Sequence, residues 1–175
     1  KLLLNSITVG SVSTSLANSG LDVDDNSTVT SLTVGHTTPV SIASDKTLSG
    51  AITVTGGSIK LDEAGTLGST VSMSGGTLDV DETLTVSGAL SQGGNITIDV
   101  ATDKTLTYSG SDLDVGANTL SIGGAGTLSN SSDSALVLDV ANSILDLTGS
   151  GTVSGPVKLE SGTLKSSGSP TISGA

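Results

Sequence analysis

Acidic residues recur at one position of a repeated pattern, and their carboxylates are the groups in this chain best suited to binding a metal. The position lies three residues after the start of an apolar-polar-apolar triplet, and it holds Asp24, Asp62, Asp81, Asp99, Asp139 and Glu160. In a parallel stack of repeats these carboxylates would lie ~5 Å apart and repel by roughly 0.8 kcal/mol per neighbour in water. A bound cation would relieve this repulsion, and an all-oxygen ligand set favours calcium.

A solvated corner is the simpler interpretation of the same residues. Aspartate is favoured at corners because its carboxylate accepts hydrogen bonds from nearby backbone amides. Three other repeats carry Asn5, Ala43 and Gly116 at this position, and the calcium-binding nonapeptide GGxGxD is absent. We therefore keep the solvated corner as the main interpretation and a calcium site as the alternative.

The residues typical of catalysis are sparse, and we predict that the protein is not an enzyme and needs no cofactor. There is no cysteine, and His36 is the one histidine, in a turn with no nucleophile near it in the sequence. Tyr108 is the one aromatic residue. It follows the apolar column of Ile52, Val71 and Leu90, which indicates a core position rather than a platform for a sugar.

Threonine pairs separated by one residue could form a surface that binds ice if they were ranked on one flat face. They occur at Thr28-Val29-Thr30, Thr53-Val54-Thr55, Thr83-Leu84-Thr85 and Thr105-Leu106-Thr107. In the sequence they look scattered over different sides and interrupted by Ser, Asp and Lys. The ordinary preference of threonine for strands explains them.

The elements that carry these residues repeat along the whole chain. The apolar-polar-apolar triplets begin at Leu2, Leu21, Val40, Ile59, Leu78, Ile96, Leu113, Leu136 and Val157. The first four steps are 19 residues, and later steps are 18, 17, 23 and 21. A period near twenty indicates a solenoid. Two further apolar positions follow most triplets, so each turn has three short strands.

We therefore predict an all-β fold: a single-stranded parallel β-helix of about nine three-sided coils of ~19 residues, roughly 43 Å long. One domain should span residues 1–175, without evident caps. Leu78, Ile96, Leu113 and Leu136 should stack in one inward column. The surplus residues of the longer coils should form loops near 123–134 and 149–155. One corner looks reused three times, as Asp45-Lys46-Thr47-Leu48, Asp81-Glu82-Thr83-Leu84 and Asp103-Lys104-Thr105-Leu106.

Composition excludes several functions. Six Lys and no Arg oppose 17 acidic residues, which gives a net charge of −11. A nucleic-acid-binding protein needs a basic surface, so none is expected to bind here. No apolar run is long enough to insert into a membrane. The sequence begins without Met and already in register, which is expected of a mature product or a fragment.

Repeats such as GGTLDVDETLTVSG and GSDLDVGANTLSIGG resemble those of bacterial β-solenoid surface proteins. These are the filamentous-haemagglutinin-like adhesins and the passenger domains of autotransporters. The resemblance covers nearly the whole chain and implies a right-handed solenoid that is exported to the cell surface or the extracellular space. It also implies a role as a stalk, fibre or adhesin.

Our main expectation is therefore a structural protein: a subunit of a head-to-tail filament or a stalk segment of a fibrous adhesin. Self-association should occur end to end, because the terminal coils carry unpaired backbone groups and nothing in 1–4 blocks the first. A binding module for a glycan or for ice is the alternative, and host or surface glycans are possible partners. A polysaccharide-active β-helix enzyme is a distant third.

Overall fold

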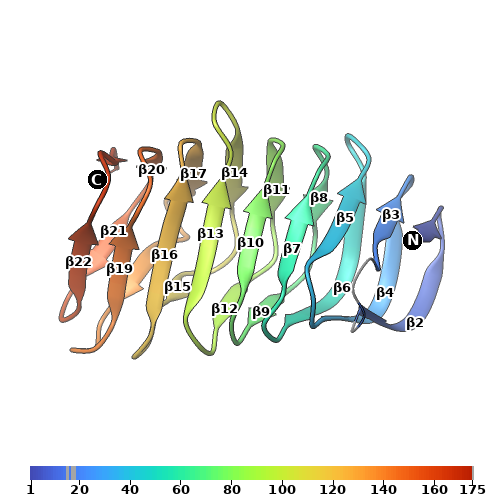
Figure 1. The fold of residues 1–175 in the computed structure, drawn as a ribbon, viewed down its shortest axis with the longest axis horizontal. Helices are drawn as coiled ribbons and strands as arrows, with labels where there is room; N and C mark the ends of the chain where they lie inside the picture. The colour runs from blue at the N-terminus through green and yellow to red at the C-terminus, as the bar shows by residue number, and fades with distance from the viewer. Residues whose placement is uncertain (15, 17–18, 175) are drawn as a thin grey trace.

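The computed structural model describes residues 1–14, 16 and 19–174, which form a rod of parallel β-strands wound into a solenoid of about eight turns (Figure 1). The predicted all-β class is confirmed. The described residues contain no helix, and hence none that could span a membrane. In Figure 1 the chain runs up the front sheet, crosses to the back at the top and advances towards its C-terminus, which is a right-handed coil.

The first side of the solenoid is a continuous parallel sheet, here called sheet A. Its strands are β1 (Leu2–Leu4), β3 (Leu21–Val23), β5 (Thr38–Ile42), β7 (Ser58–Leu61), β10 (Thr77–Val80), β13 (Ile96–Val100), β16 (Thr119–Gly124), β19 (Ile144–Leu147) and β22 (Thr163–Ser166). Each strand pairs with the one before and the one after it, so the nine strands stack in chain order.

The second and third sides begin as one bent sheet, called sheet B. Its first three strands are long and cover both sides: β2 (Thr8–Thr14), β4 (Ser27–Val34) and β6 (Thr47–Val54). Later coils divide this strand into two. The second side continues with β8 (Thr66–Leu67), β11 (Leu84–Val86), β14 (Thr105–Tyr108), β17 (Thr127–Asn130), β20 (Thr152–Ser154) and β23 (Thr171–Ile172). The third side continues with β9 (Val71–Met73) and β12 (Leu90–Gln92).

The third side then changes sheet. Beyond β12 it is built by a separate parallel sheet C, made of β15 (Leu113–Asp114), β18 (Leu136–Leu138) and β21 (Val157–Leu159). Since β12 and β15 belong to different sheets, the wall has a seam between them. Tyr108 lies at this seam, and its side chain is buried as predicted. It stacks on Val86 of the second side, however, and not on the third-side column predicted for it.

Alternation of side chains explains why these segments form strands and where they pack. In β10, Leu78 and Val80 are buried, while Thr77 and Asp79 face outward. The core is one continuous cluster of Val, Ile and Leu with Met73 and Tyr108, a composition that suits a narrow interior. Strands this short could not hold together alone, and stacking of neighbouring coils supplies the buried partner for each.

The predicted single column of triplets is wrong in the second half of the chain. Leu78 pairs with Ile98, two residues later than predicted, while Ile96 pairs with Leu120. Leu113 and Leu136 pair with each other, but in sheet C on the third side. The same apolar-polar-apolar pattern occurs on all three sides, so the pattern alone does not identify the side.

The longest turns separate Ile98 from Ile122 and Ile122 from Leu147, by 24 and 25 residues. Their extra residues lie in the corners on both sides of sheet C, at 109–112, 115–118, 131–135 and 139–143. The first predicted loop segment, 123–134, overlaps one of these corners, but it also contains the regular strand β17 and is wrong there. The second, 149–155, is wrong because it contains the regular strand β20.

Candidate functional site

The six acidic residues considered as calcium ligands lie in three separate places. Asp24, Asp62 and Asp81 follow strands of sheet A, at the corner leading to sheet B. Asp99 lies within β13 on the outer face of sheet A, beside Asp79. Asp139 and Glu160 follow β18 and β21 on the third side, where Glu160 donates its N–H to the carbonyl of Leu138.

A single acidic column is therefore not formed, because the triplets that precede these residues belong to different sides. Asp62 and Asp81 are neighbours, since the Asp81 N–H bonds to the Leu61 carbonyl. Asp24 has Ala43 in the next coil, whose N–H bonds to the carbonyl of Val23. In the described residues, no three acidic or histidine side chains lie close enough together to hold a metal ion. Calcium binding by any of the six stays a prediction.

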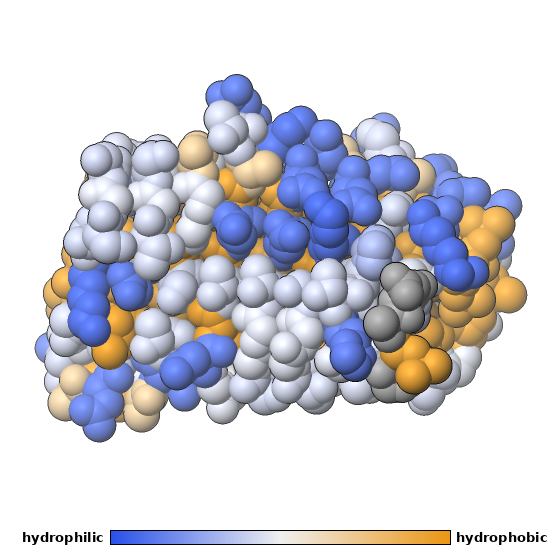
Figure 2. All heavy atoms as spheres, in the orientation of Figure 1, coloured by the Kyte–Doolittle hydropathy of each residue, from blue (hydrophilic) through white to orange (hydrophobic). Residues whose placement is uncertain are grey.

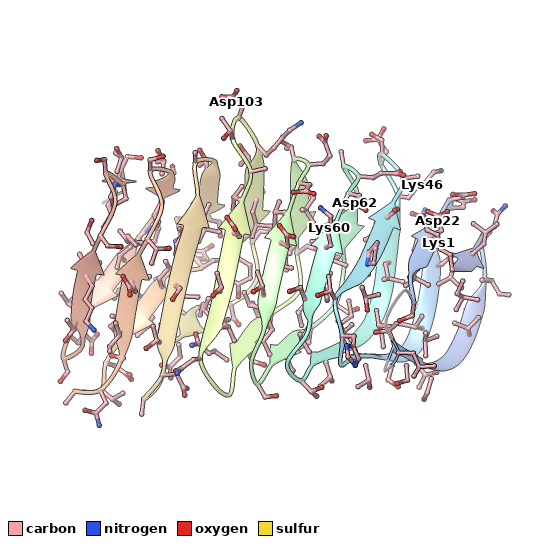
Figure 3. All side chains as sticks on the ribbon, viewed as in Figure 1. Lys1, Asp22, Lys46, Lys60, Asp62 and Asp103 are labelled. Atoms are coloured by element: carbon pink, nitrogen blue, oxygen red, sulfur yellow. The ribbon has the colours of Figure 1, made fainter. Side chains whose placement is uncertain are left out.

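The neighbouring residues Asp62 and Asp81 already have a cation between them. The Lys60 ammonium contacts Asp81 and lies 3.5 Å from an oxygen of Asp62. Figure 3 shows Lys60 and Asp62 side by side near the upper end of β7. The hydrogen bond to Asp81 raises the pKa of Lys60 above its usual value. Lysine thus supplies the positive charge that the alternative interpretation of the sequence assigned to calcium.

Four of the other five lysines each form an ion pair with an acidic residue of another coil. The pairs are Lys1–Asp22 at 3.2 Å, Lys46–Asp25 at 3.1 Å, Lys104–Glu82 at 2.6 Å and Lys158–Asp112 at 2.8 Å. All these side chains are at least partly exposed, so solvent screens each pair and its contribution to stability is small. Their regular placement neutralises local repulsion between coils without creating a pocket.

The carboxylate of Asp79 on sheet A is less well compensated by positive charge. Asp79 is directly opposite Asp99 and Lys60 in the adjacent strands. Partial burial raises the pKa of Asp79, and the nearby carboxylates of Asp81 and Asp99 raise it further. Figure 2 shows hydrophilic residues gathered over this part of sheet A. The surface here is acidic, but it is an open sheet face rather than a cleft.

The hollows on the described surface are shallow. One of about 300 Å³ is lined by Ser44, Asp62, Glu63, Ala64 and Glu82, at the corner between sheets A and B. Another, of about 210 Å³, lies on the third side near Ser72, Ser91 and Gln92. His36 lies in the turn before β5, where its carbonyl accepts a hydrogen bond from the Thr38 hydroxyl. Neither hollow includes His36, and neither brings a nucleophile and a base together.

The threonine pairs are more ordered than the sequence indicated. Thr83-Leu84-Thr85 and Thr105-Leu106-Thr107 stack directly, with Leu84 opposite Leu106 and Thr85 opposite Thr107. The prediction that the pairs are scattered holds for Thr53-Val54-Thr55, which lies on the third side. For the two stacked pairs of the second side it is wrong. Thr28-Val29-Thr30 is not aligned with them, because the register between β4 and β6 shifts after Thr28.

The two end coils are the most unusual surfaces of the rod. Large apolar side chains that are exposed gather there: Leu2, Leu3, Ile7 and Leu16 at one end, and Leu159, Leu164 and Ile172 at the other. Among the described residues, Val140 is the one other large apolar side chain that is exposed. Figure 2 shows the apolar surface at the N-terminal end, on the right of the view. Leu2, Leu159, Leu164 and Ile172 continue columns that are buried in the inner coils.

Comparison with known proteins gives no further guide, since no family model, curated protein or solved structure matches the chain. The geometry therefore carries the functional argument. It offers two open coil ends, an acidic face with paired lysines and a hydroxyl-rich face.

Proposed function

We propose that this protein is a structural component of an extracellular fibre, either the subunit of a head-to-tail filament or a stalk segment of a fibrous adhesin. The observation that carries the proposal is the exposure of apolar side chains on the two end coils. Seven exposed apolar side chains lie on them. Four of these, Leu2, Leu159, Leu164 and Ile172, pair with buried residues of the neighbouring coils. An end coil also has a row of backbone N–H and C=O groups without strand partners, which is a template for pairing with another coil.

Charge favours axial contact over lateral contact. Of the 17 acidic residues, only Glu160 lies in the first or last coil, and the other 16 lie between Asp22 and Asp146. The acidic parts of the side walls of two rods therefore repel each other, while the end faces carry few acidic residues. A coil end of one copy, or further repeats of the same polypeptide, would cover the exposed apolar side chains.

Export to the cell surface is part of the proposal and is supported by the resemblance to adhesin repeats. Host or surface glycans remain possible partners of such a stalk. A contact between the last coil of one copy and the first coil of the next does not close, so it propagates a filament. With the nine strands of sheet A stacked at about 4.8 Å, filaments of this type would repeat about every 43 Å.

Electron microscopy of the purified protein with one pair of variants tests the proposal. Ile172→Asp places a charge on the C-terminal end, and Val140→Asp places it on a side corner that is equally exposed, at 39% for both residues. We expect head-to-tail fibres from the wild type and from Val140→Asp, and isolated rods from Ile172→Asp. Isolated wild-type rods at high concentration would contradict the filament form, and a reading frame that continues the repeats at both ends would support the stalk form.

A further inference from the structure

The outer face of the second side carries hydroxyl groups in two aligned columns, which together we call the hydroxyl face. One column consists of Thr47, Thr66, Thr85, Thr107, Ser129 and Ser154. The other consists of Thr105, Thr127, Thr152 and Thr171. Every member of a column is the direct strand partner of the next, so the hydroxyl-bearing side chains are stacked coil by coil.

The hydroxyls of this face are available to an outside partner. Among the hydrogen bonds of the described residues, none involves a side-chain hydroxyl of either column. Elsewhere on the rod, the hydroxyls of Thr14, Thr38, Thr55 and Thr148 donate to backbone carbonyls. A hydroxyl can donate one hydrogen bond and accept two, so the face offers both functions to whatever covers it.

Charge is absent from the strands that build this face. The six strands β8, β11, β14, β17, β20 and β23 contain no Asp, Glu, Lys or Arg. Sheet A, in contrast, carries outward Lys60, Asp79, Asp99, Asp146 and Lys165 on its strands. In a chain with 23 charged residues, an uncharged face of this length suits a neutral partner.

The spacing of the hydroxyls suits a partner that repeats in two directions. Successive coils place them about 4.7–4.9 Å apart, and positions two residues apart along a strand are separated by about 6.6–6.8 Å. Water oxygens on a face of hexagonal ice repeat at similar distances in two directions. A peptide or a single sugar would occupy only a few of these positions.

Crystalline polysaccharide is also a neutral repeating surface, but the residues on this face suit it less well. Sugar rings are commonly bound on exposed aromatic side chains, and the one aromatic residue of this chain, Tyr108, is buried. We propose that the hydroxyl face binds ice, its aligned hydroxyls holding a layer of water in positions that the ice lattice continues. This function is independent of axial association, because the face lies on the side of the rod.

Thermal hysteresis and the shaping of ice crystals, measured on the purified full chain, test the proposal. The variant Thr85→Lys/Thr127→Lys places two charges on the hydroxyl face, two coils apart. Thr77→Lys/Ser121→Lys is the matched control, with two lysines at half-buried strand positions of sheet A, also two coils apart. Circular dichroism melts would show that both variants fold. We expect the first variant to lose hysteresis and the control to keep it.

A gain-of-function variant makes the test sharper. Ser129→Thr/Ser154→Thr completes the first column with threonine, and we expect a larger hysteresis gap than in the wild type. The proposal is overturned if the wild type neither shapes ice nor depresses its growth temperature, or if Thr85→Lys/Thr127→Lys retains wild-type hysteresis. Binding to microcrystalline cellulose without any effect on ice would overturn it too, and would assign the face to a polysaccharide.

Discussion

The phenol oxygen of Tyr108 accepts a hydrogen bond from the backbone N–H of Leu90 at 3.1 Å, across the seam where the third side passes from sheet B to sheet C. The same hydroxyl donates to the carbonyl of Ser111. In the preceding coil the corresponding N–H, that of Val71, bonds to the carbonyl of Ala89. A side chain therefore replaces a backbone partner at the point where the strand pairing is interrupted.

Replacing Tyr108 with Phe should show how much its hydroxyl contributes to stability at this seam. The variant keeps the ring and leaves the Leu90 N–H buried without its partner, so we expect a loss of about 1–3 kcal/mol in the free energy of unfolding. Urea denaturation followed by circular dichroism measures it. Thr53→Val removes an exposed hydroxyl and serves as the control, with an expected change within about 0.5 kcal/mol. Equal stability of the two variants would mean that the hydroxyl of Tyr108 is not needed at the seam.

Gly50 should not tolerate a side chain. Its φ is +120°, and a Cβ added there would lie 1.8 Å from the carbonyl oxygen of Val29. We expect Gly50→Ala to destabilise the protein by at least about 1–3 kcal/mol, through backbone strain together with the clash. Gly10→Ala is the matched control, because nothing lies within 4 Å of its added Cβ. Similar melting temperatures for the two alanine variants would contradict the position of Gly50 in the stack.

Asp79 makes stability depend on pH in a defined direction. Because burial raises its pKa in the folded state, the folded protein holds this proton more tightly than the unfolded chain. The stabilising contribution is therefore fully present below the unfolded value of 3.8 and is lost as pH rises through the folded pKa.

Asp79→Asn should remove this dependence. At pH 7 we expect the variant to be more stable than the wild type by about 0.2–1 kcal/mol, the scale of charge pairs on adjacent strands. The difference should shrink towards zero near pH 3. Thermal melts at both pH values measure it, and a variant less stable than the wild type at pH 7 would refute the assignment.

Lys60 provides a direct test of calcium at the acidic corner. Its ammonium contacts Asp81 and Asp62, so we expect the melting temperature of the wild type to be the same with calcium and with a chelator. Lys60→Gln leaves these two carboxylates beside Asp79 without the cation. Calcium should then raise the melting temperature of the variant through its preference for the folded state. A calcium-dependent shift in the wild type would instead support the original calcium prediction.

Much of the fold was predictable because it follows from local alternation. The period near twenty, the three strands per turn and the buried apolar positions can all be read from the chain, and the structure confirms them. The reused corner is confirmed for two of its three copies and is wrong for Asp81, whose φ is not positive. Asp45 and Asp103 have φ of 62° and 61°, and Lys46 and Lys104 donate N–H groups to Ala43 and Ala101.

Register was harder to predict, and the errors in the candidate sites follow from it. In the next coil two apolar residues, Ile96 and Ile98, are equally good partners for Leu78. They are two residues apart, so they point to the same face of the strand. Only the stacking of whole coils decides between them, in favour of Ile98. The proposed acidic column and the supposedly scattered threonine pairs both depended on this choice, so both changed once the coils were aligned.

The backbone hydrogen bonds between coils all point along the rod, and this orientation sets how such a rod responds to load. Tension applied at its two ends acts on the bonds of one coil at a time, as in unzipping, rather than on many coils together. Leu2 is 19 residues from its partner Leu21. A released coil of that length would extend to about 60 Å, compared with ~4.8 Å when stacked. Under load, a stalk of this construction would therefore release its coils one at a time. Each released coil would lengthen more than tenfold before the covalent chain bears the full force.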